Sequence, residues 1–600
     1  MANSSEILAQ ARELQKAGRL EEADRLCRAI LANDPDDTDA LAQLARILGQ
    51  RGQLDAAEGI LRRAARLRPD SAEISQHLRS LLAARQFQMG LVLAKQQKID
   101  DAIACMRRAV VQAPAFAEAH RSLGILLAGQ KNFHEAADSF RRAVEHKPGN
   151  AEAHYNLALA LQHQNKFEEA EADYRRALEL NPQYVHAHNN LAIVLGEQER
   201  LDEAEAAFRK TIQVAPDHAD AHANLADLLL KRNRPEEAEH CCRRALALSA
   251  DLTGAQYDLA VALGAQNKRD DAAACYRKTI ELAADHVDAH VGLSSMLLLG
   301  GSLAEGWPEY EWRLKHKDMP KSPLPRPQWQ GESLAGRTIL LRAEQGAGDA
   351  IQFVRYAGLV KQQGCTVLVG CTPNLKRLLA TFPGLDGAVV SGQPLPHYDV
   401  HLPMLSLPGI FGTTLETIPA KVPYLFPDEA SIAEWRDELG DEQALSIGIA
   451  WQGNPAQRRD EFRSIPLARF GGVAGTRGVR LYSLQFGVGR EQLNDAADWP
   501  LTDFGDRLGD FHHTAALIRN LDLVISCDSA PAHLAGALGV PVWLVVPFAP
   551  DWRWMLDRAD SPWYPTMRLF RQTRAGDWES AFRQIDEELA RLVEAKSTSR

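Results

Sequence analysis

The stretch from Leu521 to Val546 reads LDLVISCDSAPAHLAGALGVPVWLVV, and it decides the fold class of the second half of the chain. Its two apolar runs, 521–526 and 540–546, have the length and composition of buried parallel strands. The residues between them have room for one short helix. The stretch therefore predicts a β-α-β unit in an open, doubly wound α/β sheet.

The helix of this unit has clear start and stop signals. Asp528 and Ser529 stand at its N-cap, Pro531 falls in its first turn and Gly539 marks its end. The unpaired amides at such a helix start bind anions, and in an open α/β sheet that start lies at the ligand-binding edge. We therefore expect a nucleotide diphosphate there; the alternative is a β-α-β unit without a ligand.

Length and composition set the class of protein. The chain has 600 residues, 45% hydrophobic and 24% charged, so two or three globular domains are expected. A net charge of −11 argues against nucleic acid as a partner. The chain has no run of about 20 apolar residues and no signal-peptide core at its start. Its eight cysteines form no CxxC motif. These features predict a cytoplasmic protein without a membrane span.

The first 300 residues repeat with a period of 34. Alanines recur at this spacing, and prolines close the units. The alanines are Ala102, Ala136, Ala170, Ala204, Ala238 and Ala272, and the prolines are Pro114, Pro148, Pro182 and Pro216. A 34-residue helix-turn-helix with a small residue at the helix crossing is similar to the tetratricopeptide repeat, TPR. An α-solenoid with a concave face for partners is therefore expected.

The array is interrupted once. Two earlier copies of the repeat are centred on Ala23 and Ala57, and the step from Ala57 to Ala102 is 45 residues instead of 34. An insertion near residues 72–82 is therefore expected to interrupt the stacking. About eight repeats are predicted in all.

An aromatic segment and a proline-rich segment follow the repeats. Trp307, Tyr310 and Trp312 predict a last amphipathic helix that caps the array. The segment MPKSPLPRPQW then predicts an extended, semi-rigid connector, packed rather than free. The predicted domains are a TPR solenoid at 1–312, the connector at 313–336, a first α/β lobe on the acceptor side at 337–430 and a second lobe on the nucleotide-sugar side at 431–600.

A row of asparagines marks a candidate binding surface in the array. Asn156, Asn190 and Asn224 precede the core leucine of successive repeats, where the first helix faces the concave groove. Primary amides can pair with the backbone of an extended peptide whatever its sequence. The row resembles the asparagine ladder of O-GlcNAc transferase. The alternative is a solvated polar face.

Histidines also recur at the 34-residue spacing. They are His120, His154, His188, His222 and, two units on, His290. One histidine per repeat gives ligands roughly 10 Å apart, whereas a zinc site needs three or four that converge. We expect these rings to pack in the solenoid and expect no metal site.

The second half has the pattern of two α/β lobes. TILLRA at 338–343 and TVLVGC at 366–371 predict strands of the first lobe, with helices at 350–364 and 374–382. SIGIAWQGN, VRLYSLQFG and the 521–546 unit belong to the second. Two doubly wound lobes that face one another across a cleft define the GT-B architecture of many glycosyltransferases.

Four motifs carry a family resemblance across roughly residues 335–590. AEQGAGDAIQFVRYA, GIAWQGN, RRDEFRSIPL and DSAPAHLAGALGVPV resemble the heptosyltransferases, glycosyltransferase family 9. The resemblance implies an inverting transfer of a hexosyl or heptosyl group from a nucleotide-diphosphate donor. It also implies that Asp349 is the catalytic base and that Arg463 contacts the leaving phosphate.

Each expected role has an alternative. Asp349 follows a glycine-containing turn at a helix start, where the macrodipole lowers a carboxylate pKa, so a weak base or a purely structural Asp is expected. Trp552 and Arg553 either shape the pocket or pack in the core. The residues expected to bind the donor are Gly346, Gly348, Trp451, Gln452, Asn454, Arg463, Ser464, Asp528, Ser529, Ala530 and His533.

The sequence thus predicts a metal-independent inverting glycosyltransferase without a cofactor. Its donor is expected to be ADP- or UDP-linked, and helix amides with Arg463 take the place of a divalent ion on the diphosphate. Its acceptor is expected to be a protein or peptide held by the TPR groove. Two alternatives stay open: a glycan or lipid precursor as acceptor, and a non-catalytic TPR adaptor with a degenerate GT-B-like half.

Overall fold

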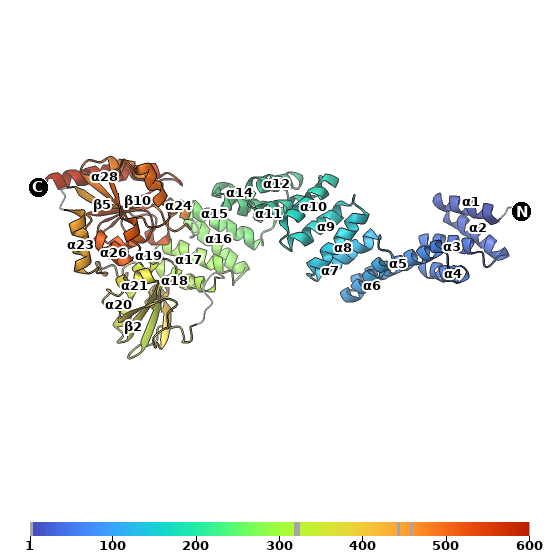
Figure 1. Cartoon of the computed structure of the whole chain (residues 1–600), viewed down its shortest axis with the longest axis horizontal. Helices are drawn as coiled ribbons and strands as arrows, with labels where there is room; N and C mark the ends of the chain where they lie inside the picture. The colour runs from blue at the N-terminus through green and yellow to red at the C-terminus, as the bar shows by residue number, and fades with distance from the viewer. Residues whose placement is uncertain (1–3, 317–323, 441–443, 456–459, 599–600) are drawn as a thin grey trace. The chain divides into compact units, whose positions relative to one another are not determined.

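The computed structural model describes residues 4–316, 324–440, 444–455 and 460–598. It divides into two compact units, residues 1–228 and 229–600. Figure 1 shows the helices and strands of the whole chain. Pro320 and Pro323 of the predicted connector, and Arg458 and Arg459 of the RRDEFRSIPL motif, lie outside the described residues.

The first unit consists of antiparallel helix pairs. In each repeat a residue in the left-handed conformation lies in the turn between the two helices, and these residues recur every 34 positions except across the insertion, from Gly52 to Gln97. The helices are α1 (Ser4–Lys16), α2 (Leu20–Asn33), α3 (Thr38–Gln50), α4 (Leu54–Leu67), α5 (Ala72–Lys95), α6 (Ile99–Gln112), α7 (Ala117–Gly129), α8 (Phe133–His146), α9 (Ala151–Gln162), α10 (Phe167–Leu180), α11 (Val185–Glu197), α12 (Leu201–Val214) and α13 (Ala219–Lys231), which spans the division. The predicted tetratricopeptide pattern is confirmed.

The predicted insertion is absorbed by one helix. The 11 extra residues do not form a loop; they lengthen α5 to 24 residues, so that it serves two repeats. Its first half packs through Ile74, Leu78 and Leu81 against the preceding helices. Its second half packs on α6, where Gly90 lies against Met106.

The second unit begins with the last repeats and continues into two parallel sheets. The repeat helices are α14 (Pro235–Leu248), α15 (Thr253–Ala265), α16 (Arg269–Leu282), α17 (Val287–Leu299) and α18 (Leu303–Tyr310), followed by the 3-10 turn η1 (Glu311–Lys315). Trp307 and Tyr310 of α18 are buried in the core of the first α/β lobe. The predicted capping helix exists, and it is also part of that core. The described part of the connector is packed, since Trp329 is fully buried and Gln328 bridges to His401.

The first sheet has four parallel strands in the order β3-β2-β1-β4. They are β1 (Thr338–Arg342), β2 (Thr366–Cys371), β3 (Gly387–Val390) and β4 (Val400–Pro403). The helix predicted at 350–364 is broken into α19 (Ala347–Phe353), η2 (Val354–Tyr356) and α20 (Ala357–Lys361). The remaining helical segments are α21 (Pro373–Leu379), η3 (Met404–Ser406), α22 (Leu407–Ile410) and α23 (Glu429–Leu439).

The second sheet has six parallel strands in the order β10-β9-β8-β5-β6-β7. They are β5 (Leu445–Ala450), β6 (Val479–Ser483), β7 (Leu501–Asp503), β8 (Leu523–Ser526), β9 (Val542–Val546) and β10 (Met567–Arg571). The 521–546 unit folds as predicted, with helix α27 (Ala530–Ala537) between β8 and β9. The other helical segments are α24 (Asp460–Arg463), η4 (Leu467–Phe470), α25 (Gly471–Gly475), η5 (Arg490–Ala496), η6 (Gly505–Arg507), α26 (Phe511–Ile518), η7 (Trp552–Trp554) and α28 (Trp578–Thr598).

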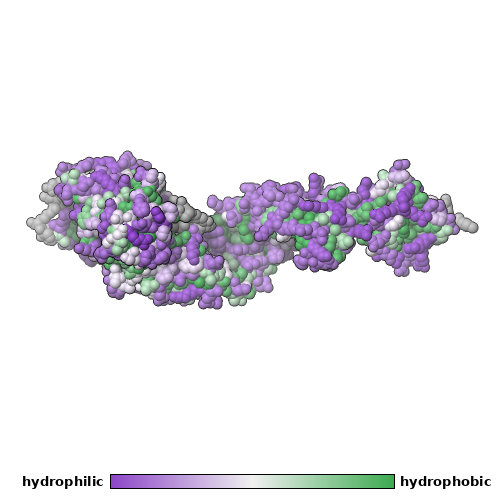
Figure 2. Space-filling model, turned by 90° about the horizontal axis from the view of Figure 1, so that it is seen from below, coloured by the Kyte–Doolittle hydropathy of each residue, from purple (hydrophilic) through white to green (hydrophobic). Residues whose placement is uncertain are grey.

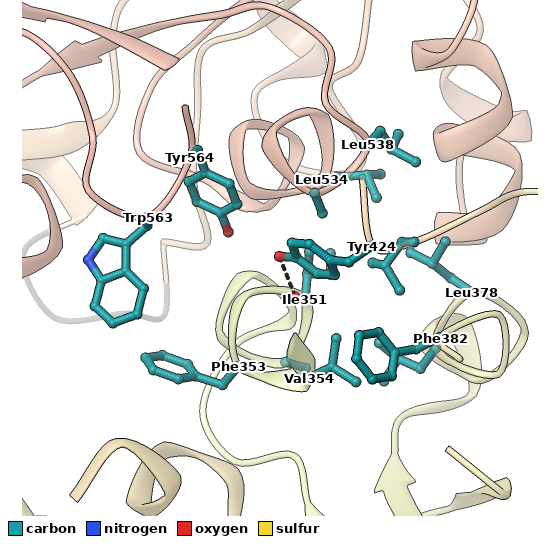
Figure 3. Close-up of a cluster of buried hydrophobic side chains, with 14 of the residues drawn as sticks. Ile351, Phe353, Val354, Leu378, Phe382, Tyr424, Leu534, Leu538, Trp563 and Tyr564 are labelled. Carbon is teal, nitrogen blue, oxygen red and sulfur yellow. Dashed lines mark hydrogen bonds between the residues drawn. The ribbon is translucent and has the colours of Figure 1, made fainter. Parts of the chain in front are cut away.

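The two sheets meet through a buried hydrophobic cluster, drawn in Figure 3. Ile351 and Phe353 of α19 lie on one side, with Trp563 and Tyr564 from the loop before β10 on the other. The Tyr424 hydroxyl donates to the Ile351 carbonyl at 3.0 Å. α19 also packs directly on α27. The lobes are therefore joined by a continuous core.

The face of the molecule drawn in Figure 2 is largely polar. Hydrophilic residues cover much of this face, with hydrophobic patches between them. Among the described residues, no helix combines the length and the apolar content that crossing a membrane requires.

Candidate functional site

A cleft of about 740 Å³ lies between the two lobes of the second unit. In each sheet the strand order reverses once, between β1 and β4 and between β5 and β8, and open α/β sheets bind ligands at the carboxyl ends of strands beside such a reversal. The turn after β1 and the turns after β5 and β8 all line this cleft. The predicted residues that line it are Gly346, Gly348, Asp349, Gln452, Asn454, Arg463, Asp528, Ser529, Ala530 and His533.

Trp451 does not line the cleft, contrary to expectation. It is fully buried, and its indole N–H donates to the Gly489 carbonyl at 3.1 Å. Strand side chains alternate between faces, so Trp451 continues the buried row of Ile447 and Ile449 into the core on the far side of the sheet. Its neighbour Gln452 reaches the cleft instead.

Ser464 also stands behind the cleft wall. Its hydroxyl accepts the Gly453 N–H at 3.1 Å and donates to the Asp460 carboxylate at 2.9 Å. It therefore holds the turn after β5 in place. Arg463 does line the cleft, and Asp460 accepts its Nε–H at 2.8 Å, which leaves the guanidinium fork beside Gly453.

Asp349 occupies the start of α19, where it closes a capping box. Its carboxylate accepts the Gly346 N–H at 3.0 Å with one oxygen and pairs with Arg553 through the other. Burial raises the pKa of Asp349, and this outweighs the lowering by Arg553 and by the Gly346 amide. The expected lowering of the Asp349 pKa by the helix start is therefore not the dominant effect.

Arg553 is the central charge of the cleft. It is buried and donates to Asp349, to Asp551 at 2.8 Å and to the Gln352 side chain at 2.8 Å. Burial lowers the pKa of Arg553, but the charges of Asp551 and Asp349 outweigh burial and raise it, so the guanidinium stays a cation. The sequence left open whether Trp552 and Arg553 shape the pocket or pack in the core. Arg553 lines the cleft, whereas Trp552 packs in the core.

Asp528 directly precedes the N-cap of α27, much as Asp349 lies in the first turn of α19. Burial, and then the nearby charge of Asp551, raise the pKa of Asp528 to about 6. Ser529 is the N-cap of α27, yet its side chain makes no capping bond and points to Ser526, at 3.2 Å. The first amides of α27 are thus not capped by that side chain.

His533 lines the cleft from inside α27 and stays neutral. Its Nδ1 lies 3.0 Å from the Tyr564 hydroxyl, and its Nε2 lies 3.8 Å from Asp528. Burial, and then Arg553, Arg355 and Arg463, lower the pKa of His533 well below its ordinary value. His533 is thus a polar but uncharged wall of the cleft.

The loop after β6 adds an apolar part to the lining of the cleft, which was not predicted. Phe486 and Val488, on this loop, line the cleft with 58% and 50% of their surface exposed. Gln485 pins this loop to the turn after β5, accepting the Gln452 N–H at 3.1 Å and donating to the Val488 carbonyl at 2.8 Å. A lone Phe on a loop carries no sequence signal of a site, which is why it was missed.

Part of the asparagine row in the first unit belongs to a hydrogen-bonded network. Asn224 donates to Asn189, Asn189 to Asn190 and Asn190 to the Tyr155 hydroxyl, each at 3.2 Å. Asn156, Asn190 and Asn224 are all half-buried. Two of the three predicted rungs, Asn190 and Asn224, are therefore linked through Asn189, a buried residue that the sequence did not single out.

The repeated histidines close their own repeats. Each of the five rings lies within 3.2 Å of the backbone carbonyl six residues earlier, which belongs to the closing Pro in four repeats and to Ala284 in the last. Packing, as expected, explains this row. Among the described residues no group of three or more potential ligands is arranged to hold a metal ion. Metal independence of the cleft stays a prediction.

Comparisons with known proteins support the repeat region. Tetratricopeptide repeat families match residues 14–84, 87–151, 151–184, 183–251 and 257–311. The chain is also similar to Protein FlbA of Caulobacter vibrioides (strain ATCC 19089 / CIP 103742 / CB 15), at 27% identity over 323 residues, 49% of this chain and 53% of FlbA. The chain thus spans about half the length of the curated relative it matches.

Solved structures give only partial likenesses. MamA is 24% identical with a TM-score of 0.26, covering 27% of this chain and 94% of its own. YrrB, a TPR protein described as having an unusual peptide-binding site, is 22% identical with a TM-score of 0.28, covering 32% and 95%. Pseudomonas aeruginosa PilF is 20% identical with a TM-score of 0.32, covering 35% and 96%.

Proposed function

We propose that this TPR protein is a glycosyltransferase of the GT-B type, which transfers a sugar from a nucleoside-diphosphate donor. One observation carries the proposal: the turns after β1, β5 and β8 bring Asp349, Arg463 and the start of α27 to one cleft. A base on one wall and an anion site on the other are what an inverting transfer needs.

The chemistry follows from these groups. The acceptor hydroxyl attacks the anomeric carbon as Asp349 takes its proton; the new C–O bond forms while the bond to the diphosphate breaks. Arg463 and the first amides of α27 stabilise the charge on the departing nucleoside diphosphate. The raised pKa of Asp349 favours proton transfer to it. The apolar part of the lining at Phe486 offers a surface on which a nucleobase stacks.

The repeats supply the acceptor in this proposal. The network through Asn190, Asn189 and Asn224 presents amide groups of the kind that pair with peptide backbone. We propose a protein or peptide acceptor held there, with ADP or UDP as the nucleotide of the donor.

Isothermal titration calorimetry of the full chain tests donor binding. ADP, UDP, GDP and CMP are each titrated as free nucleotides and as sugar conjugates, and one of them should bind. Arg463→Ala should weaken that binding at least tenfold, whereas Arg469→Ala, an exposed arginine nearby, should not. Asp349→Asn should bind the donor and transfer no sugar. If none of the tested nucleotides or nucleotide sugars binds, the proposal is refuted.

The second candidate function is a non-catalytic TPR adaptor. It is favoured by the acidic lining of the cleft, where Asp349, Asp528 and Asp551 outnumber Arg463 and Arg553. Both oxygens of Asp349 are also engaged already. A wild-type protein that binds a polypeptide partner and no nucleotide would establish this function instead.

A further inference from the structure

The loop that carries Arg553 into the cleft is held from behind by the last repeats. It runs from the end of β9 through Phe548 and Asp551 to Met555. One of its sides lines the cleft through Asp551 and Arg553. Its other side contacts the α15–α16 turn and helices α17 and α18.

Asn267 makes the polar contact. It lies in the turn between α15 and α16, and its side-chain N–H donates to the Phe548 carbonyl at 2.5 Å. Its backbone φ is +57°, and the corresponding residues of five earlier repeats have the same left-handed conformation. They are Gln97, Lys131, Asn165, Glu199 and Asn233. Since Lys and Glu adopt this conformation as well, the turn does not require an asparagine, and the amide of Asn267 is free to serve the loop.

Aromatic packing makes the second contact. Trp552 lies edge-on against Trp307 at 5.5 Å and against Tyr310 at 5.9 Å, both from α18. Trp552 directly precedes Arg553. The packing of the Trp552 ring against Trp307 and Tyr310 therefore also fixes the backbone position of Arg553. α17 packs on the same turn, η7.

Met555 makes the third contact. Its φ of +52° is rare for a residue with a side chain, and such conformations persist only where the surroundings hold them. Its side chain lies against Gly301, in the turn between α17 and α18. The repeats thus contact the loop at three points: before Asp551 at Phe548, between Asp551 and Arg553 at Trp552, and after Arg553 at Met555.

We propose that the last two repeats are part of the functional site and that Asn267 is a positioning residue for the loop from Phe548 to Met555. Through that loop Asn267 fixes the positions of Asp551 and Arg553. Because Arg553 pairs with Asp349, Asn267 also influences the position of Asp349. The effect on ligand binding rests on the proposed function, whereas the effect on the loop itself does not.

The test compares two substitutions at the same repeat position in the full chain. Asn267→Gly removes the amide and keeps the turn, because Gly52 and Gly301 occupy that position in other repeats. Asn233→Gly is the matched control, since Asn233 is exposed one repeat earlier. The pair Asn267→Asp and Asn233→Asp repeats the comparison with a side chain of similar shape that cannot donate.

Two readouts separate the inference from the proposed function. Hydrogen exchange of the amides from Phe548 to Met555, followed by mass spectrometry, should be about fivefold faster in the Asn267 variants and unchanged in the Asn233 variants. The affinity for the nucleotide that wild type binds should fall by a similar factor in the Asn267 variants alone. Equal exchange in all four variants and wild type would overturn the inference. Faster exchange in the Asn267 variants, with no nucleotide bound by wild type, would uphold the positioning role and remove the proposed function.

Discussion

The Asp528 carboxyl group is half-buried at the start of α27 and has a pKa of about 6, above the ordinary value near 3.9. The folded chain therefore binds this proton more tightly than the unfolded chain. Its contribution to the free energy of unfolding is full below about pH 4 and is lost as the pH rises through about 6. Asp528→Asn should raise that free energy by about 1–3 kcal/mol at pH 7.5 and leave it unchanged below pH 4. Urea titrations at both pH values measure the difference.

Asp428 provides a control of opposite sign. It caps α23 by accepting the Ser431 N–H at 2.8 Å, and it pairs with His512 at 2.7 Å. These bonds hold the pKa of Asp428 well below its ordinary value, so its ionised form stabilises the fold above about pH 4 and that stability is lost at lower pH. Asp428→Asn should therefore lower the melting temperature at pH 7.5. A lower melting temperature for Asp528→Asn at that pH would contradict the account of its burial.

Single residues also show what the sequence could predict of the site. Asp349, Asp528 and Ser529 were placed correctly at helix starts because capping signals are local. Arg553 could not be ranked above its neighbours, because its partner Asp349 is 204 residues away and only the fold brings them together. Trp451 was misplaced because the sequence does not say which face of a strand meets the other lobe.

The contact between α19 and α27 sets a size limit on Gly348. A Cβ atom there would lie 2.8 Å from Cδ2 of the His533 ring and 3.6 Å from the Ala530 Cα. Gly348→Ala must therefore move His533 or separate the helices, at a cost of about 1–3 kcal/mol. Gly475→Ala, with open space around its Cβ, is the matched control and should be neutral. Thermal unfolding compares them, and equal melting temperatures would show that the helices adjust freely.

The lengthened helix α5 changes the role of one repeat position. Met89 and Leu123 are 34 residues apart, yet Met89 is 54% exposed and Leu123 is 6% exposed. Met89 lies beyond the part of α5 that packs on the preceding helices. We expect Leu123→Ala to cost about 2–5 kcal/mol and Met89→Ala less than about 0.5 kcal/mol. Circular dichroism during urea unfolding measures both; similar losses would mean that Met89 is buried in solution.

The predictability of the elements follows their length and regularity. The apolar runs of β1, β2, β8 and β9 stand out in the sequence, whereas β3 and β7 are only four and three residues long and do not. The insertion near residue 72 was visible as a change of spacing. Its form was not, because a spacing does not distinguish a loop from a longer helix.

At the scale of the whole molecule, the repeat pattern and the contacts divide the chain at different places. The sequence predicts that the solenoid ends at residue 312. The contacts in the folded chain instead group residues 1–228 into one compact unit and residues 229–600 into another. The difference comes from α18 and the turn after it. Trp307 donates to the Thr413 carbonyl at 2.9 Å, and the buried Arg313 pairs with Glu344 at 2.7 Å. Helices that belong to the array by sequence thus belong to the α/β core by packing.

Two fragments decide which division describes the folded protein. A fragment of residues 233–600 keeps α14–α18 and should fold with a cooperative melting transition. A fragment of residues 324–600 lacks Trp307 and Tyr310, and the loss of a buried aromatic side chain costs about 3–5 kcal/mol each. The combined loss approaches the free energy of unfolding of a typical domain, about 5–15 kcal/mol. The shorter fragment should therefore lack fixed tertiary structure by near-ultraviolet circular dichroism.

The double variant Trp307→Ala/Tyr310→Ala in the full chain should show the same loss of fixed structure around Trp552. If residues 324–600 melt as cooperatively and at the same temperature as 233–600, the α/β half is an independent domain and the repeats only adjoin it.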